Sequence, residues 1–376
     1  MKDTSLRNDL DNLIENFYNY IYYDTACISL NFDELNNDTA KSFISNYFGL
    51  GQKGSVVGNI GEAWDNNSPR PVHTVLLYLL FLLLYKDKRI GQKICNKIKG
   101  FKTVENDNNF HLRFFFLLCL YHDYGYYIEE KRKEIPAFNA SYCEFDILNS
   151  IKGTYFKTPY TKENIKKYFY YRRLSEHGIS GGTLLSKRLK DNFKKAAEIA
   201  NAQGANEFQY PDNIQWNKKK DFSFYDFISS IIIKHNIWYA YKCEDKAKYS
   251  QMELNDFIIK EDGNNKLNFK YDPILFLFCL LDSIEPSKKL NVCCEGRPGE
   301  LGIKALLENF YFDVSLDPSQ NKYEIIIKLN DSIHAPGYIY SIKSLEEWMD
   351  LKVDVNLEES KATISFYYKQ NYEKIS

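Results

Sequence analysis

His122 and Asp123 stand next to each other directly after the apolar run 117–121. An imidazole and a neighbouring carboxylate suit a first-row transition metal, and the second carboxylate oxygen can bridge to another ion. Taken singly, the remaining histidines are better explained as capping or core residues, and His111 and His334 have no place in the pattern. Together with the pair, however, the residues at four other apolar segments predict a metal centre: His73, His177, His235 and Asp282.

Helices are expected to position these side chains, because apolar residues recur at helical spacing around each of them. A helix that begins at Ser68-Pro69, with serine as cap and proline in the first turn, extends to about residue 84 and places His73 in its first turn. A helix over about 110–121 ends at the His-Asp pair. Four other helices are expected. One covers 160–173, and one starts among the small residues after His177 and continues over 183–189. The last two are 223–241, with His235 past its middle, and 272–281, with Asp282 at its end.

The pattern changes after about residue 300. Short β-rich runs separated by turn residues follow a short helix over 300–309, and a helix over 344–349 interrupts them. The expected strands are 310–314, 323–327, 351–355 and 362–366. We therefore predict a mainly α protein in three parts: an N-terminal helical segment over 1–64, with a helix at 5–23, a helical domain over 65–299, and a small α+β domain over 300–376.

The composition excludes some classes of function. The net charge of the 376-residue chain is -1, with 49 basic and 50 acidic residues, so no global field draws it to nucleic acid or an anionic membrane. The longest apolar stretch, 75–85, is shorter than the roughly 20 residues that a membrane helix needs. Eight cysteines without CxxC spacing, and an N-terminus without a signal-type apolar run, predict a cytoplasmic protein with reduced thiols. The oligomeric state stays open.

The order His, His-Asp, His, His, Asp on separate helical segments resembles the HD superfamily of metal-dependent phosphohydrolases, over roughly residues 65–290. The run EHGISGG at 176–182 and the helix end LLDSIEP at 280–286 strengthen the resemblance. It implies an HD-type helical bundle with one or two divalent ions of Mn, Fe, Co, Ni or Zn. The implied ligands are His73, His122, Asp123 and Asp282 for the first ion, and Asp123, His177 and His235 for the second.

The sequence also departs from the family. Many relatives follow the His-Asp pair with a small apolar residue, glycine, and then lysine or histidine, whereas Tyr124-Gly125-Tyr126 stands here. The Gly-Tyr-Pro motif of the branch that degrades cyclic di-GMP is absent, which argues against that substrate. Four basic residues near the candidate ligands could replace the missing charge on a substrate phosphate, although a basic residue of this kind is more often a surface residue: Arg70, Arg172, Arg173 and Lys234.

The leading functional hypothesis is hydrolysis of a phosphoester in a nucleotide or nucleotide-derived signal by metal-activated water, with Asp123, His177 and His235 as the catalytic set. One alternative is a nuclease that resembles the HD nucleases of CRISPR systems and acts on single-stranded DNA or RNA. Its support is the basic run 86–102 and the basic cluster 166–173. Another is a module without catalysis that holds a structural metal or senses a nucleotide, with the C-terminal part docking a partner.

Overall fold

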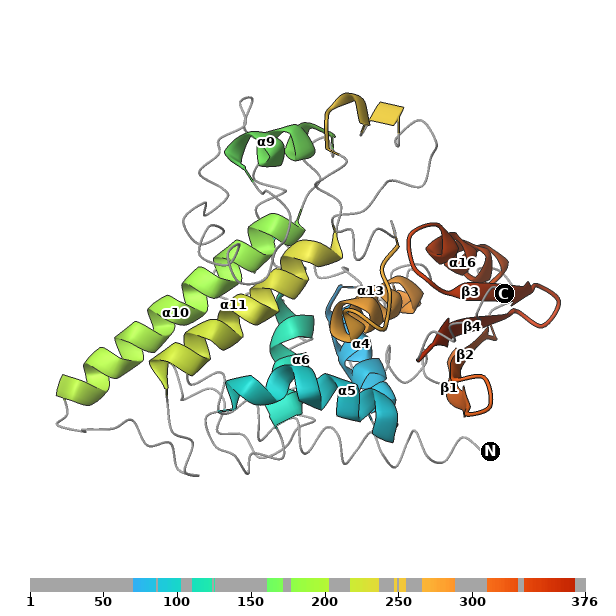
Figure 1. Cartoon of the computed structure of the whole chain (residues 1–376), viewed down its shortest axis with the longest axis horizontal. Coiled ribbons are helices and arrows are strands. Elements are labelled where there is room, and N and C mark those ends of the chain that lie inside the picture. Colours follow the sequence, from blue (N-terminus) through green and yellow to red (C-terminus); the bar gives the residue numbers. More distant parts are fainter. Residues whose placement is uncertain are drawn as a thin grey trace, which may run out of the picture.

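The computed structural model (Figure 1) describes the following residues: 70–85, 87–102, 110–123, 125, 161–171, 177–202, 217–236, 247–248, 250–254, 266–287, 310–330 and 335–368. The expected helices at 5–23 and 300–309 lie outside these ranges. Among the described residues, helices form one body and a small sheet lies at one end of it. The mainly α character predicted from the sequence is therefore confirmed.

Two long apolar helices form the centre of the helical body. α4 (Arg70–Tyr85) and α6 (Phe110–Tyr121) contact each other, and the stacked rings of Phe81 and Phe115 lie 4.7 Å apart. Both helices agree with the bounds expected from hydrophobic spacing. Each is apolar on nearly all sides, which is typical of a helix buried by neighbours all round.

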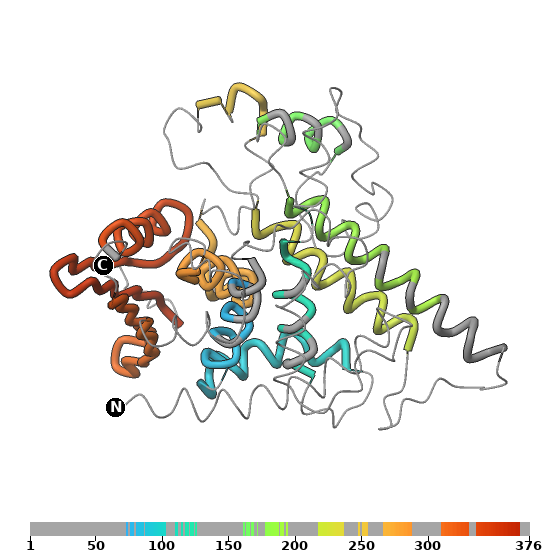
Figure 2. The backbone as a smooth tube through the Cα atoms, turned by 180° about the vertical axis from the view of Figure 1, so that it is seen from behind, coloured from blue at the N-terminus to red at the C-terminus, as the bar shows by residue number. Residues whose placement is uncertain are grey.

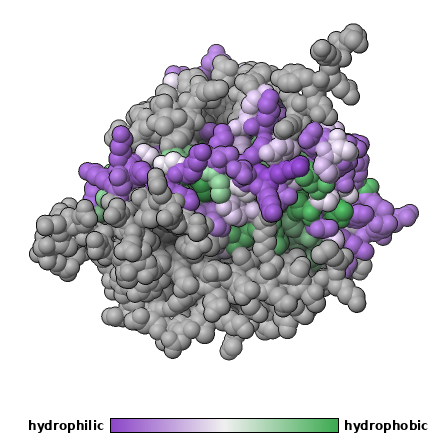
Figure 3. Space-filling model, turned by 60° about the horizontal axis from the view of Figure 1, so that its bottom comes forward, coloured by the Kyte–Doolittle hydropathy of each residue, from purple (hydrophilic) through white to green (hydrophobic). Residues whose placement is uncertain are grey.

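α5 (Lys88–Ile98) and a 3-10 turn, η2 (Lys99–Phe101), lie across the end of α4 (Figures 1 and 2). Asp87 caps α5 through hydrogen bonds that its Oδ1 accepts from the amides of Arg89 and Ile90, both at 3.0 Å. Three isoleucines at helical spacing bury one face of α5, and its lysines occupy the other. Figure 3 views the side of the molecule on which α5 lies, and hydrophilic side chains gather there among the described residues.

Three further helices complete the part of the bundle that carries candidate ligands. They are α10 (Gly178–Ala202), α11 (Lys218–His235) and α13 (Pro273–Ile284). α10 and α11 lie side by side along their length in both views (Figures 1 and 2). Asp272 caps α13, accepting a hydrogen bond from the amide of Leu275 at 3.1 Å. A shorter helix, α9 (Lys162–Tyr171), attaches through the Tyr168 hydroxyl, which donates to the carbonyl of Asn236 at 2.6 Å.

The C-terminal unit (residues 310–368) is an antiparallel sheet with the strand order β1-β2-β4-β3. The order places β4 between β2 and β3, so the chain crosses over once, and α16 lies in the crossover connection. Four strands and one helix were expected here, and the four strands are confirmed. The elements are β1 (Phe310–Asp317), β2 (Lys322–Leu329), α16 (Ala335–Lys343), β3 (Lys352–Asn356) and β4 (Lys361–Tyr367).

The C-terminal unit and the helices share one hydrophobic core. Phe276 of α13 packs on Phe366 of β4 with ring centroids 5.1 Å apart. The Tyr323 hydroxyl of β2 donates to Asp87 Oδ1 at 2.7 Å, directly at the cap of α5. Lys93 of α5 lies 4.3 Å from the centroid of the Tyr368 ring, where the ammonium gains a cation–π contact. The unit is therefore packed firmly on α5 and α13.

Some expected boundaries are wrong. α11 ends at His235 rather than at 241, and it begins earlier than expected because the side chain of Asn217 caps it by accepting the amide of Lys220. α13 continues past residue 281, so Asp282 lies in its last turn. The helix expected over 344–349 is only a 3-10 turn, η4 (Ser344–Glu347), which continues α16. The sequence analysis missed α16 altogether. In the described part of the chain, no helix is long and apolar enough to span a membrane.

Candidate metal centre

Five helix ends meet where the candidate ligands lie. His73 is in the first turn of α4, and His122 and Asp123 follow the last residue of α6. His177 directly precedes α10. The last turns of α11 and α13 carry His235 and Asp282. The structure thus brings together all six residues that the sequence predicts as ligands, from segments more than 200 residues apart.

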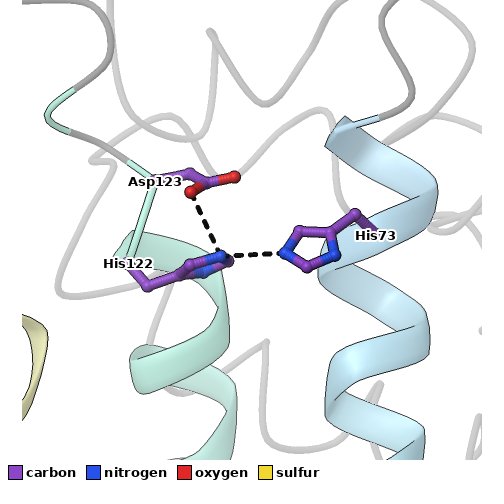
Figure 4. A group of neighbouring side chains, drawn as sticks. All are labelled: His73, His122 and Asp123. Carbon is purple, nitrogen blue, oxygen red and sulfur yellow. Dashed lines mark hydrogen bonds and ion pairs between the residues drawn. The ribbon is translucent and has the colours of Figure 1, made fainter. Parts of the chain in front are cut away.

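The tightest group is His73, His122 and Asp123, whose ligand atoms all lie within 4.8 Å of one another and which could hold a metal ion. The two imidazole rings point toward each other, and the Asp123 carboxylate lies beside the His122 ring (Figure 4). His73 Nε2 is 3.1 Å from His122 Nε2, and His122 Nε2 is 3.2 Å from Asp123 Oδ1. Asp282 Oδ1 joins the group at 3.0 Å from His73 Nε2 and 3.6 Å from His122 Nε2.

His177 and His235 form a second pair beside this group. Their Nε2 atoms are 3.2 Å apart, and His177 Nε2 is 3.9 Å from Asp123 Oδ1. The ring of His235 also lies 5.8 Å from that of His122, centroid to centroid. Asp123 therefore lies between the two histidine pairs, which is the position that a carboxylate shared by two metal sites requires.

The protonation of two histidines follows from their hydrogen bonds. His122 Nδ1 is 2.7 Å from the carbonyl oxygen of Cys119, and His235 Nδ1 is 2.5 Å from that of Ile232. A carbonyl oxygen only accepts, so each Nδ1 carries a hydrogen and donates it. Burial lowers the pKa of His235 to about 4 and also lowers the pKa of His122, although nearby carboxylates act in the opposite direction. Near neutral pH both rings are neutral, and their Nε2 atoms present lone pairs.

Glu285 imposes the same arrangement on His73. Its Oε2 lies 2.5 Å from His73 Nδ1, and both side chains are fully buried. A carboxylate accepts the Nδ1 hydrogen, which directs His73 Nε2 at His122 Nε2. Two lone pairs 3.1 Å apart repel each other unless a proton or a metal cation lies between them. The donor set therefore fits a cation at this point.

The spacing of the donor atoms gives a second test of fit. Two ligands that each lie 2.0–2.1 Å from one ion, at angles between octahedral and tetrahedral, are about 2.9–3.4 Å apart. The separations of His73 Nε2 from His122 Nε2 and from Asp282 Oδ1, 3.1 and 3.0 Å, fall in this range. So does the separation of His122 Nε2 from Asp123 Oδ1, 3.2 Å. The separation of His122 Nε2 from Asp282 Oδ1 is slightly larger, 3.6 Å. The residues present thus fit a transition-metal ion in chemistry and, for three of these four separations, in spacing.

Glycines allow the helix ends to approach. A Cβ atom on Gly125 would lie 1.9 Å from the carbonyl oxygen of His177, and one on Gly181 would lie 2.8 Å from the amide nitrogen of Gly125. Gly182 approaches α11, where Ser229 donates to its carbonyl at 2.6 Å. These contacts hold α6, α10 and α11 close together at the centre.

The centre is buried but reaches solvent at two of its side chains, those of Asp282 and His177. The side chains of His73, His122 and Asp123 are 0–1% exposed, whereas that of Asp282 is 21% exposed and that of His177 is 10% exposed. A closed structural metal site excludes solvent, while a catalytic one keeps a position for water or substrate. Solvent access at Asp282 and His177 is typical of a catalytic metal site.

The predicted phosphate-binding residues are less informative. Arg172 and Arg173 lie outside the described residues, and so does the side chain of Arg70, the first residue of α4. Lys234 Nζ lies 3.8 Å from Asp272 Oδ2, at the start of α13. Asp282 is at the other end of the same helix, about 15 Å along its axis. A phosphate contact by Lys234 therefore stays a prediction.

The basic run at 86–102 lies away from the candidate centre. α5 follows the C-terminal end of α4, while His73 is at the N-terminal end, about 18 Å distant along the helix. Two lysines of α5 reach toward neighbouring segments. Lys93 donates to the carbonyl of Tyr368 at 3.2 Å, and Lys97 to that of Tyr271 at 3.4 Å. This run is therefore not a direct extension of the centre.

The sequence analysis missed Glu285, although it quoted the segment in which Glu285 lies. The signal was its spacing three residues after Asp282, which places both acids on one side of a helical turn. No family model, curated protein or solved structure with which the chain was compared matches it. The function must accordingly be argued from the geometry of this centre.

Proposed function

We propose that this protein is a metal-dependent phosphohydrolase of the HD type that cleaves a phosphoester of a nucleotide or nucleotide-derived signal. One observation carries the proposal: two pairs of imidazoles, with Asp123 between them and the partly exposed Asp282 beside them, converge from five helix ends. Pairs of histidines and carboxylates in this arrangement are the donors of catalytic Mn, Fe, Co, Ni or Zn centres.

The residues divide into two sets. His73, His122, Asp123 and Asp282 would hold one ion. A bound ion of this kind lowers the pKa of a coordinated water and offsets negative charge on phosphoryl oxygens. His177 and His235 either complete a second site with Asp123 or contact the substrate phosphate directly. Among the described residues only the first set contains a group whose ligand atoms all lie within 4.8 Å, which favours one ion as the minimum.

The chain's own residues would prepare the reaction by orientation. Helix-end carbonyls fix His122 and His235 through Nδ1, so both rings present Nε2 to the reacting centre. The burial of both rings keeps them neutral, which leaves these nitrogens as electron-pair donors at neutral pH. Asp282 and His177 reach solvent, and a substrate phosphate would arrive there.

The near-neutral net charge suits a small anionic substrate better than a long polyanion. α5, which carries the basic run cited for the nuclease alternative, lies at the end of α4 that is far from His73. The solvent access at Asp282 and His177 also favours catalysis over a structural metal. These three features support a phosphohydrolase of small nucleotides ahead of its rivals.

The test begins with protein stripped by a chelator and reloaded separately with Mn²⁺, Fe²⁺, Co²⁺, Ni²⁺ or Zn²⁺. Each form is incubated with mono-, di- and triphosphates and with cyclic nucleotides, and phosphate and nucleoside products are measured. Turnover with at least one metal, lost in Asp123→Asn and retained in Asp221→Asn, is the expected result. Asp221 is a buried acid in the first turn of α11, at the opposite end from His235, and so controls for the loss of a buried carboxylate. Absence of product with every metal and substrate would refute the proposal.

A further inference from the structure

Glu285 is a buried carboxylate outside the candidate ligand set. It caps the C-terminal end of α13, is 1% exposed, and places Oε2 at 2.5 Å from His73 Nδ1. Ser287 holds it from the other side: its amide donates to Oε1 at 2.8 Å, and its hydroxyl donates to Oε2 at 2.6 Å. A buried carboxylate is expensive unless such donors surround it. Both oxygens are therefore fixed, and with them the orientation of the His73 ring.

The C-terminal unit reaches the same point. Tyr338 of α16 is 2% exposed and donates its hydroxyl hydrogen to the carbonyl oxygen of Ile284, the residue before Glu285. The last carbonyls of a helix lack partners within the helix, so an outside donor both satisfies this group and fixes the direction in which the chain leaves. Tyr338 thus sets the backbone from which the Glu285 side chain extends.

We propose that Glu285 is a positioning residue of the metal centre, and that the C-terminal unit takes part in the centre by holding Glu285 through Tyr338. The inference rests on the proposed metal site. Contacts run from the Tyr338 hydroxyl to the carbonyl of Ile284, then through the Glu285 carboxylate to His73 Nδ1. Because Glu285 accepts the Nδ1 hydrogen, His73 Nε2 stays available as a ligand and becomes a better electron-pair donor.

Under this proposal the C-terminal unit orients a metal ligand in addition to stabilising the fold. A second tyrosine of the unit, Tyr323, is equally buried and also bonds to the helical body through its hydroxyl, but at Asp87. Asp87 caps α5 and lies beyond the C-terminal end of α4, whereas His73 is in the first turn of α4. If the unit only stabilised the fold, loss of either hydroxyl would have the same effect on metal binding. Under the proposal only the loss of the Tyr338 hydroxyl weakens it.

The experiment compares Co²⁺ binding by the full-length protein and its variants after removal of metal with a chelator. Affinity is measured by calorimetry, the ligand environment by the visible absorption of bound Co²⁺, and folding by the thermal midpoint without metal. The test variants are Glu285→Gln, Ser287→Ala and Tyr338→Phe, and the matched controls are Asp221→Asn and Tyr323→Phe. Phenylalanine retains the packing of each tyrosine ring and removes only the hydroxyl.

We expect Glu285→Gln to weaken Co²⁺ binding about 10- to 100-fold and to alter the absorption spectrum, as is typical when the partner of a metal-binding histidine is lost. Tyr338→Phe and Ser287→Ala should each weaken binding by up to about tenfold, the effect of one hydrogen bond. Both controls should bind Co²⁺ as the wild type does, even where they lower the thermal midpoint.

The outcomes separate this inference from the proposed function. A wild-type protein that binds no Co²⁺ or other transition metal removes the proposed metal site and the inference with it. A wild type that binds, with test variants that bind as tightly as the controls and show the same spectrum, overturns the inference alone. Should Glu285→Gln fail to fold, Ser287→Ala and Tyr338→Phe decide, because both retain the buried carboxylate.

Discussion

The substitution Gly125→Ala tests whether close backbone contact builds the centre. The added methyl carbon would lie 1.9 Å from the carbonyl oxygen of His177 and 2.7 Å from its Cα, whereas ordinary contacts begin at 3.4 Å. These neighbours are backbone atoms and cannot rotate away as a side chain can. The start of α10 and the end of α6 must therefore separate by about 1.5 Å.

A shift of this size affects both stability and the ligands. Insertion of a methyl group into a packed interior costs about 1–3 kcal/mol of unfolding free energy, and a clash with backbone falls at or above the upper end. Metal–ligand distances tolerate only about 0.2 Å. Because His177 moves with its backbone while Asp123 stays beside the end of α6, the separation of His177 Nε2 from Asp123 Oδ1, now 3.9 Å, should increase.

Urea unfolding and Co²⁺ titration measure the two effects. Gly100→Ala is the matched control, since a Cβ atom there meets nothing within 4 Å, and its unfolding free energy should stay within about 0.5 kcal/mol of the wild type. We expect the unfolding free energy of Gly125→Ala to be lower by about 3 kcal/mol or more. The variant should also bind fewer Co²⁺ ions, or bind them more weakly. Equal unfolding midpoints and equal Co²⁺ affinities for the two variants would refute the close approach of α6 and α10.

Three further predictions concern the metal and the proton. Asp123→Asn should reduce Co²⁺ affinity at least about 100-fold, because it removes the carboxylate nearest both histidine pairs; calorimetry against Asp221→Asn checks this. A metal at 100 times its dissociation constant should stabilise the protein by about 2.7 kcal/mol, seen as a higher thermal midpoint that a chelator reverses; an unchanged midpoint would contradict it. Metal-free protein should lose stability as the pH falls from 6.5 to about 4, since the unfolded chain protonates His235 at 6.5 and the folded one only near 4. The loss amounts to about 3 kcal/mol for this residue, and His235→Asn should show a flatter profile of unfolding free energy against pH.

Much of the helical body was predictable, because hydrophobic spacing determined it. α4 and α6 are apolar on nearly every side and end where polar residues begin, so their extents agree with the expected ones. α11 was harder. Apolar residues continue past its end, and nothing local marks His235 as the last helical residue. Its end depends on the tertiary arrangement, in which the Asn236 carbonyl accepts the Tyr168 hydroxyl of α9.

The members of the candidate centre were predictable as a set, whereas their supports were not. His122-Asp123 is a compact signal, and the family resemblance directed attention to the other ligands. Glu285 had only a weak signal, its spacing from Asp282, because its importance depends on contact with His73, which lies 212 residues earlier in the chain. Tyr338 lies on α16, a helix that sequence periodicity failed to reveal behind the turn residues around it. Long-range contacts of this kind require the fold.

Helix ends explain why the candidate ligands are arranged as they are. His122 and His235 each donate Nδ1–H to a carbonyl three residues earlier, in the last turn of the helix that each of them follows or ends. The imidazole thus bonds to a carbonyl at the end of its helix through Nδ1 and directs its Nε2 atom at the centre. Extension of either helix by one turn would bring a backbone amide to that carbonyl and place further backbone in the space that the ring now occupies. The stop at His235, which the sequence analysis placed too late, is therefore a requirement of the centre: a variant that lengthened α11 should lose ligand geometry even with all six ligands present.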